Sequence, residues 1–170
     1  MSDSITTGLI AGTVTLVVAF LTQFVAEKYK RFQDGSALAA GLAGELSSYK
    51  EALPILLTTL KEWGALPSGH EQLFLRPMDK PADVYYTASV GRIGLLGTEL
   101  VEDVVYVYSN INAFRGGFDI LSKSFKEMST AEFRVRASAC YMVLSQASVR
   151  GEALIPKLRQ RALQRFFGFS

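Results

Sequence analysis

Hydrophobic residues are concentrated near the start of the chain, in a run from Thr6 to Ala26 that contains no charged residue. As a helix, the 21 residues of this run would be about 30 Å long, which is the thickness of the hydrocarbon core of a bilayer. We therefore predict a transmembrane helix at residues 6–26, preceded by a short extracytoplasmic N-terminus at residues 1–5.

The flanks of this run favour an uncleaved anchor over a secretory signal peptide. A signal peptide starts with a basic region and ends at a small-x-small cleavage site. Here the only charged side chain before the run is that of Asp3, and the run ends as Phe24-Val25-Ala26-Glu27-Lys28 without an Ala-x-Ala motif. The apolar stretch is also longer than the core of a signal peptide.

Basic residues set the expected orientation of the anchor. Lys28, Lys30 and Arg31 follow the run and no basic side chain precedes it, so the C-terminal side is expected to face the cytoplasm. The single cysteine, Cys140, cannot form an intrachain disulfide, which is in accord with a reducing compartment. The predicted localisation is the bacterial inner membrane, crossed once.

The pattern after the anchor predicts helices. The membrane helix is expected to continue through Lys28 to Phe32 and to stop near Asp34-Gly35, at the end of a basic juxtamembrane connector at residues 27–35. Ser36 is a candidate N-cap for the next helix. Pro54 is expected to interrupt that helix. The stretch from Gly64 to Pro81 has no periodicity and is predicted to be a long loop. The apolar positions that recur every three or four residues in this helix are Leu38, Leu42, Leu46, Tyr49 and Leu53.

The second half of the chain also reads as helical. Pro81 suits the first turn of a short helix, and Thr98 can cap the next one. The run from Val104 to Tyr108 is rich in β-branched valine, which by itself would favour a strand. The acidic turn before it and the 3.6-residue period favour a helix instead. Ser129-x-x-Glu132 is a capping-box signature that predicts the start of a further helix. Gly116-Gly117 is expected to weaken or break the helix that Thr98 begins, and Gly151 and Pro156 are expected to interrupt the last one. The predicted fold is all-α, with a cytosolic helical domain at residues 36–170.

The predicted transmembrane helix has one face of small or polar residues. Small faces allow two helix backbones to approach closely, and hydroxyl or amide groups can form hydrogen bonds across the contact. One interpretation is homo-oligomerisation through this face, either as a closed interface or as a ring around a pore. The other is an anchor in which lipid merely tolerates these residues. The face consists of Gly8, Gly12, Thr15, Ala19, Thr22, Gln23 and Ala26.

The formal net charge of +2 is too small to indicate a surface that binds a polyanion, so nucleic acid is not favoured as a partner. The end of the chain is nevertheless basic. This segment could contact anionic lipid headgroups or a phosphate-bearing nucleotide signal, or could be the charged outer face of a bundle helix. Its basic residues are Arg150, Lys157, Arg159, Arg161 and Arg165.

Catalytic constellations are not found in the sequence. His70 is the only histidine, so His70 and Cys140 fall short of a metal site, and Cys140 lies in an apolar helical run that suits an inert core thiol. The glycines at positions 91, 94 and 97 lack the Lys-Ser/Thr of a phosphate loop. Glu99, Glu102 and Asp103 are better explained as a helix first turn than as a cation site. We predict no enzyme activity, no cofactor and no metal.

Part of the sequence resembles a broad group of small bacterial proteins in which an N-terminal anchor precedes a helical domain of unknown function. The resemblance covers roughly residues 36–115 and implies no catalytic residues. It is carried by Pro81-Ala-Asp-Val-Tyr-Tyr, Ile93-Gly-Leu-Leu-Gly-Thr-Glu-Leu and Val105-Tyr-Val-Tyr.

In architecture alone, the chain is similar to the single-pass helical accessory proteins of CRISPR systems that oligomerise into membrane pores. The Arg–His pair of the nuclease domains in such proteins is missing, since Trp63, Gly64 and Ala65 stand where the arginine would be.

Two functions remain open from the sequence. The first is a non-enzymatic, oligomeric inner-membrane protein whose cytosolic bundle assembles subunits or receives a signal, with a pore as one outcome and a defence or stress system as its context. The second is a monomeric tether that recruits a cytosolic or membrane partner.

Overall fold

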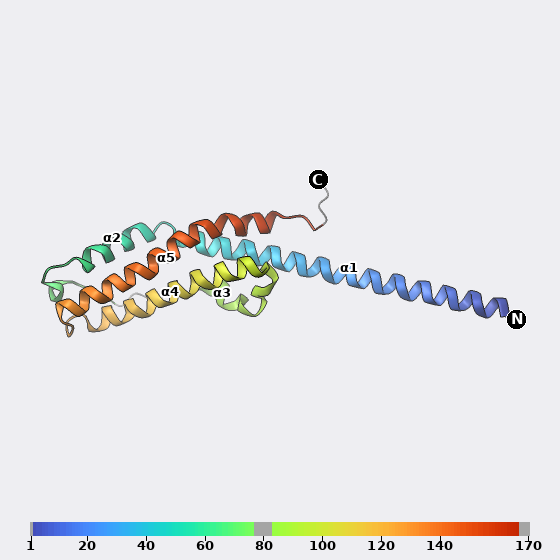
Figure 1. Ribbon diagram of the computed structural model, residues 1–170, viewed down its shortest axis with the longest axis horizontal. Coiled ribbons are helices and arrows are strands. Elements are labelled where there is room, and N and C mark those ends of the chain that lie inside the picture. Colours follow the sequence, from blue (N-terminus) through green and yellow to red (C-terminus); the bar gives the residue numbers. More distant parts are fainter. Residues whose placement is uncertain (1, 77–82, 167–170) are drawn as a thin grey trace.

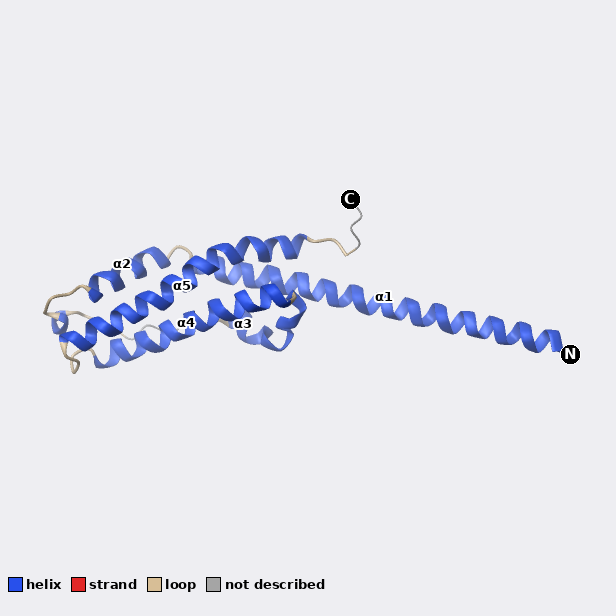
Figure 2. Cartoon of the chain, viewed as in Figure 1, coloured by secondary structure: helices blue, strands red, loops and turns tan. Residues whose placement is uncertain are grey.

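The computed structural model describes residues 2–76 and 83–166, and for residues 2–14 it describes the backbone only. The described residues form helices joined by turns and loops and contain no strand, which confirms the predicted all-α fold (Figures 1 and 2). Its elements are α1 (Ser2–Tyr49), α2 (Leu53–Gly64), the 3₁₀ helix η1 (His70–Gln72), α3 (Val84–Ser89), the 3₁₀ helix η2 (Val90–Leu96), α4 (Thr98–Ser124) and α5 (Thr130–Leu163).

Helices α4 and α5 form a long pair joined by a short turn, and α5 also packs against α1 and α2. The short helices α3 and η2 contact α1 close to the start of α4. Figure 1 shows that only the C-terminal half of α1 belongs to this bundle, while its N-terminal half extends away alone. With 48 residues, α1 is about 70 Å long.

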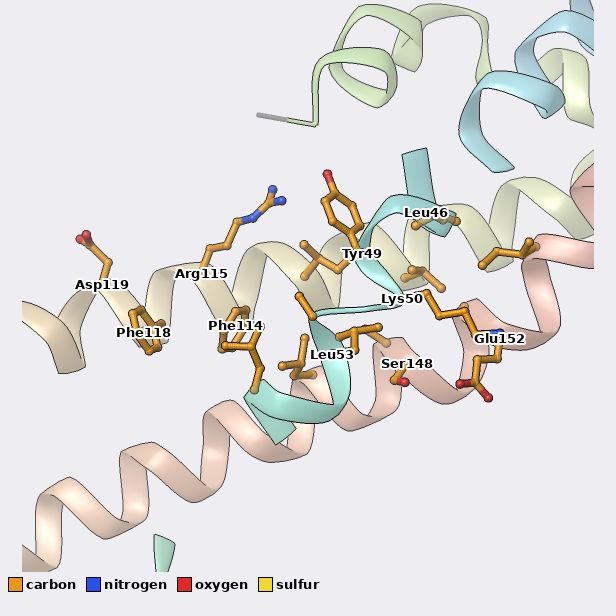
Figure 3. Close-up of a pocket in the computed structure, with 18 residues that line it drawn as sticks. Leu46, Tyr49, Lys50, Leu53, Phe114, Arg115, Phe118, Asp119, Ser148 and Glu152 are labelled. Atoms are coloured by element: carbon orange, nitrogen blue, oxygen red, sulfur yellow. The ribbon is translucent and has the colours of Figure 1, made fainter. Parts of the chain in front are cut away.

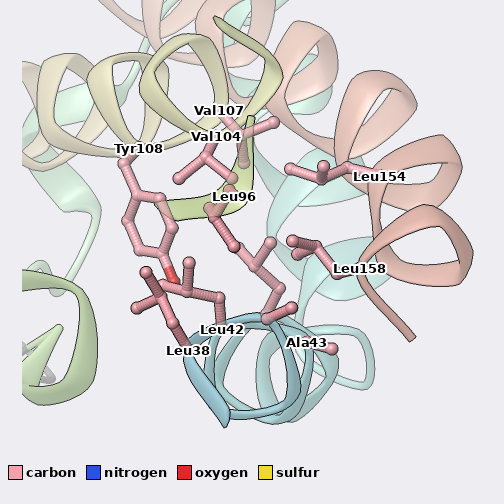
Figure 4. Packing of buried hydrophobic residues seen from close by; sticks show 11 residues of the cluster. Leu38, Leu42, Ala43, Leu96, Val104, Val107, Tyr108, Leu154 and Leu158 are labelled. Carbon is pink, nitrogen blue, oxygen red and sulfur yellow. The ribbon is translucent and has the colours of Figure 1, made fainter. Parts of the chain in front are cut away.

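One hydrophobic core joins α1 to the rest of the bundle. Figure 4 shows Leu38 and Leu42 of α1 facing Tyr108 and Val104 of α4, with Leu158 of α5 beside them. Burying a leucine side chain contributes about 1.5–3 kcal/mol to stability, so this cluster fixes the half of α1 that it contains. Its buried members are Leu38, Ala39, Leu42, Ala43, Leu46, Leu96, Val104, Val107, Tyr108, Leu154 and Leu158.

A second core fills the other end of the bundle, where α2 covers the α4–α5 pair. The helix start predicted from Ser129-x-x-Glu132 lies there, and the N-cap is confirmed because the Ser129 hydroxyl accepts a hydrogen bond of 3.2 Å from the Glu132 N–H; the Glu132 carboxylate binds Arg136 at 2.8 Å. This core consists of Leu60, Phe114, Leu121, Phe125, Met128, Phe133, Ala137, Cys140 and Leu144.

The predicted helix end at Asp34-Gly35 is wrong, because α1 runs without a break through the connector to Tyr49. Gly35 serves close packing instead: a Cβ at this position would lie 2.6 Å from the carbonyl oxygen of Leu95 in η2. Ser36 is not an N-cap, and its hydroxyl donates to the Phe32 carbonyl of the same helix at 3.1 Å. The glycine that looked like a helix stop is therefore a contact point.

The breaks predicted inside the later helices are also wrong. Helix α4 continues through Gly116-Gly117 to Ser124, and a Cβ on Gly117 would lie 2.8 Å from the sulfur of Cys140. Helix α5 continues through Gly151 and Pro156 to Leu163. Packing along the bundle holds these helices together despite the poor helix propensity of the residues.

Other boundaries agree more closely with the sequence. The chain turns at residues 50–52, just before Pro54 in the first turn of α2, as predicted. Thr98 is the first residue of α4, but the N-cap is Gly97, whose φ of 91° suits glycine. Helix α3 begins at Val84, and Pro81 lies outside the described residues.

No helix in the described part of the chain is long and apolar enough to cross a membrane. The predicted span at residues 6–26 falls partly outside that part, because the side chains of residues 6–14, including Gly8 and Gly12, are not described. The transmembrane helix therefore stays a prediction.

Candidate functional site

The N-terminal half of α1 leaves a long apolar surface in solvent. We call residues 15–31 the arm; each of them is exposed. Leu16 and Phe20 keep 73% and 70% of their surface accessible. Large apolar side chains cover more than half of the circumference of this helix, and small or polar residues occupy the remaining face, so the arm has a broad apolar surface that the described part of the chain leaves exposed. They are Leu16, Val17, Val18, Phe20, Leu21, Phe24, Val25 and Tyr29.

The described part of the predicted small face is exposed along the arm. It consists of Thr15, Ala19, Thr22, Gln23 and Ala26. The hydroxyl of Thr22 donates to the Val18 carbonyl of its own helix at 2.8 Å. This hydroxyl is therefore satisfied without a partner across a helix contact or water in a pore.

Aromatic residues mark the base of the arm, where α1 enters the bundle. The ring of Phe166, just after α5, packs edge-on against Tyr29 at 5.3 Å and against Phe32 at 5.4 Å between centroids. The guanidinium of Arg161 lies 4.7 Å above the Phe32 ring and donates to the Ser36 hydroxyl. These contacts fasten the end of α5 to the base of the arm.

The opposite end of α1 forms one wall of a cavity of about 190 Å³. Figure 3 shows Phe114 and Phe118 from α4, Ser148 and Glu152 from α5, and Leu53 after the turn that ends α1. A cavity of about 150 Å³ lined by apolar side chains holds a benzene molecule, so this one suits a ligand with one ring. Its apolar lining is Leu46, Ala52, Leu53, Leu56, Val107, Ile111, Phe114, Phe118, Leu144, Ala147 and Ile155.

One edge of the cavity is polar and tightly held. The carboxylate of Asp83, buried before α3, forms a two-pronged ion pair with Arg115 and accepts a hydrogen bond of 2.7 Å from the Tyr49 hydroxyl. Burial, together with the hydrogen bond to Asp83, raises the pKa of Tyr49 to about 12. Because Tyr49 is the last residue of α1, this network fixes the end of the helix at the cavity wall.

A second carboxylate ties α1 to α3 and α4. Glu45 accepts hydrogen bonds from the backbone N–H groups of Tyr85 and Tyr86, at 2.9 and 3.1 Å, and from the Tyr108 hydroxyl at 2.7 Å. Burial, followed by the bond to Glu45, raises the pKa of Tyr108. Close approach at this point depends on Gly41, where a Cβ would lie 1.9 Å from the Tyr85 ring. The bundle half of α1 is therefore held by specific polar contacts as well as by apolar packing.

The predicted basic segment lies largely in contacts within the bundle. Arg150 and Lys157 bind Asp103 of α4 at 2.7 and 3.0 Å, and Arg150 also binds Glu102. Burial opposes ionisation of Asp103, but hydrogen bonds and charges from these two residues lower its pKa. Arg159 donates to the Ser47 hydroxyl, Arg161 to that of Ser36, and Arg165 is exposed. Contact with lipid headgroups or phosphate stays a prediction.

His70 and Cys140 have separate structural surroundings. The fully buried His70 ring donates through Nε2 to the Met128 carbonyl at 2.9 Å, and its Nδ1 lies 3.3 Å from the Thr130 hydroxyl. Burial raises the pKa of the Cys140 thiol to about 11, which keeps it protonated and weakly nucleophilic. Both nitrogens of His70 are used in joining the loop after α2 to the α4–α5 turn.

Sequence reasoning missed the cavity and the pairing of the acidic turn of α4 with the basic residues of α5. The pairing had a sequence signal, since the acids at 99, 102 and 103 and the bases at 150 and 157 are spaced along helix faces. The cavity had no signal in the sequence, because its lining residues come from four helices that are brought together only by the fold.

Among the described residues, no group of three His, Cys, Asp or Glu side chains is placed to hold a metal ion. Comparisons of the chain with protein-family models, with curated proteins and with solved structures found no significant match. The resemblances suggested by the sequence therefore receive no support from these comparisons.

Proposed function

We propose that this chain is a non-enzymatic, membrane-anchored relay module: residues 6–26 of α1 lie in the bilayer, and the bundle on the cytosolic side receives a signal. One observation carries the proposal. A single unbroken helix runs from the exposed apolar arm, through the core, to the wall of the cavity.

The surface of the arm supports membrane insertion. Moving apolar surface out of water is favourable by about 25 cal/mol per Å², and the arm offers this surface over more than half of its circumference. The exposed basic residues Lys28, Lys30 and Arg31 follow at the boundary with the bundle, the arrangement expected on the cytoplasmic side. An apolar surface this broad suits lipid better than a groove on a soluble partner.

The continuity of α1 supports a relay. Tyr49 is about 35 Å from Ala26 along the helix, so the cavity is out of reach of the acyl chains of the bilayer. Its occupant would be a small aromatic molecule without net charge, since the lining is mostly apolar and its four charged residues, Lys50, Arg115, Asp119 and Glu152, are two of each sign. Arg115 and Asp119 also already pair with Asp83 and Lys123. A ligand that shifts Leu46 or Tyr49 would tilt or rotate the arm with them, because a packed helix moves as a unit.

Membrane insertion is tested by extracting cell membranes at alkaline pH and locating the full chain. We expect it to stay in the membrane pellet. A cysteine introduced by Ser68→Cys, in a Cys140→Ala background, should react with a membrane-impermeant maleimide only after permeabilisation. Release of the chain into the supernatant, or labelling from outside intact cells, would contradict the proposal.

Ligand binding is tested on the full chain in lipid nanodiscs with benzene as the probe. We expect a saturable rise in the melting temperature of the bundle. Ser148→Phe should abolish the rise because the new ring fills the cavity, whereas Ser145→Phe, on the same helix but outside the cavity lining, should keep it. An equal rise in both variants would rule out the cavity as the binding site.

A further inference from the structure

Helix α5 carries a row of uncharged residues along the side that faces away from α1, α2 and α4. We call this row the α5 stripe. Its nine members follow one another at alternating steps of four and three residues, and each one is exposed. They are Val135, Ala139, Met142, Gln146, Val149, Ala153, Pro156, Gln160 and Leu163.

The core of the bundle does not account for the stripe. Val149 and Leu163 keep 71% and 81% of their surface accessible, whereas Leu144 and Leu158 on the opposite face of α5 are buried. Alternating steps of four and three over four heptads are the spacing of the a and d positions of a coiled coil. The stripe thus has the pattern of a second helix-packing face, left uncovered in a single chain.

We propose that the α5 stripe is the interface with a second copy of this chain, in which the two α5 helices run parallel. In heptad terms, d is occupied by Val135, Met142 and Val149, and a by Ala139, Gln146 and Ala153. Each apolar d residue would pack against the same residue of the second copy across a two-fold axis, and the small alanines at a would allow the two helices to approach closely.

Charges beside the stripe favour the parallel direction. A parallel pair places Glu152, at g, next to Lys157 of the second copy, at the following e position, twice by symmetry. Lys157 already binds Asp103 of its own chain at 3.0 Å, so Glu152 would be a further carboxylate around an ammonium group that stays partly exposed. An antiparallel pair with Val135 opposite Leu163 would instead bring the two Arg150 side chains together. The parallel register also sets Gln146 opposite Gln146. The Gln146 oxygen accepts a hydrogen bond of 3.4 Å from the Tyr106 hydroxyl, and its NH₂ group can donate to the amide of the second copy.

The direction also follows from membrane anchoring, and to that extent the inference rests on the proposed function. Two copies anchored in one bilayer through α1 have their bundles on the same side, so a two-fold axis along the membrane normal makes α5 parallel to α5. Pro156 interrupts the backbone hydrogen bonds of α5. We therefore place the closest contact before it, from Val135 to Ala153.

Disulfide trapping in native membranes tests the interface, with Cys140→Ala as background. Met142→Cys and Val149→Cys should each give a disulfide-linked dimer under mild oxidation, because equal d positions face each other across a parallel pair. Val105→Cys provides the matched control, since it is exposed on α4 outside the stripe. Equal trapping at Val105 and Val149, or trapping only between different positions such as 135 and 163, would overturn the inference.

A mass measurement gives a second readout that does not depend on oxidation. Met142→Glu should halve the mass of the detergent-solubilised chain in light scattering, and Val105→Glu should leave it unchanged. Alkaline extraction of the same samples separates the two proposals. If the wild-type chain stays in the membrane pellet but is monomeric, the proposed interface is wrong and the proposed anchor stands. If the chain is released by alkaline extraction but Val149→Cys still forms a disulfide-linked dimer, the anchor is wrong and the interface stands.

Discussion

The two halves of α1 belong to one helix and are both rich in apolar residues, yet their surroundings are opposite. In the bundle half, Leu38, Leu42 and Leu46 form a buried stripe, and Glu45 makes polar contacts to its side. In the arm, exposed large apolar residues cover more than half of the circumference, and small or polar residues form the remaining face. The comparison teaches that a narrow apolar stripe finds its partner within the chain, whereas a broad exposed apolar surface needs a partner outside it.

The largest contrast is expected from leucine truncation in the two halves. Leu42→Ala should lower the free energy of unfolding of the bundle by about 2–5 kcal/mol, because it leaves a cavity in the core. Leu21→Ala in the arm should change it by less than about 0.5 kcal/mol. Urea unfolding in nanodiscs can be followed by the fluorescence of Trp63, the only tryptophan, which packs against Phe118 and Phe133. Equal losses in both variants would mean that the arm packs on the bundle.

A smaller contrast is expected between two glutamates of α1. Glu45→Gln should cost about 1–3 kcal/mol of bundle stability, because the amide has one acceptor oxygen for the three donors that Glu45 now serves. Glu27→Gln, exposed on the arm, should be neutral in the same unfolding measurement. A neutral result at Glu45 would show that packing alone holds this half of α1.

Acid should weaken the bundle and leave the arm unaffected. The folded chain lowers the pKa of Asp103, so the stabilisation is present above the unfolded value of about 3.9 and is lost as the pH falls below it. We expect the urea midpoint to fall between pH 5 and pH 3 by more in the wild type than in Asp103→Asn, with membrane attachment unchanged. Identical pH profiles of the urea midpoint in the wild type and in Asp103→Asn would show that Asp103 does not cause the loss of stability in acid.

Local sequence patterns predicted the helical class, the N-cap at Ser129 and the core positions of α1, because these depend on local spacing. The prediction failed for glycine, because a glycine can either end a helix or allow another segment to pack closely against it. Gly35 and Gly117 were interpreted as breaks, but each permits a close contact with a residue distant in sequence, Leu95 and Cys140 respectively. The cavity and the Asp83–Arg115–Tyr49 network also depend on distant residues, so local patterns carry no signal for them. The α5 stripe was open to detection, since its heptad spacing is present in the sequence.

The smallest effects are expected from two hydroxyls that make the same local bond in the two halves. Ser47 and Thr22 each donate to the carbonyl four residues earlier, at 2.6 and 2.8 Å, and Ser47 also accepts from Arg159. Ser47→Ala should therefore cost about 0.5–1.5 kcal/mol of bundle stability, the usual contribution of one hydrogen bond, and Thr22→Val should cost nothing measurable.

Thr22→Val also separates an anchor from a pore. A hydroxyl satisfied within its own helix is compatible with lipid, so the variant should remain in the membrane, and expression of either form should leave the membrane potential unchanged, as read by a potential-sensitive dye. Depolarisation by the wild type that Thr22→Val abolishes would mean that Thr22 lines a water-filled path. The arm would then be a conducting element, and its exposed small face, rather than its apolar surface as a whole, would decide how copies assemble.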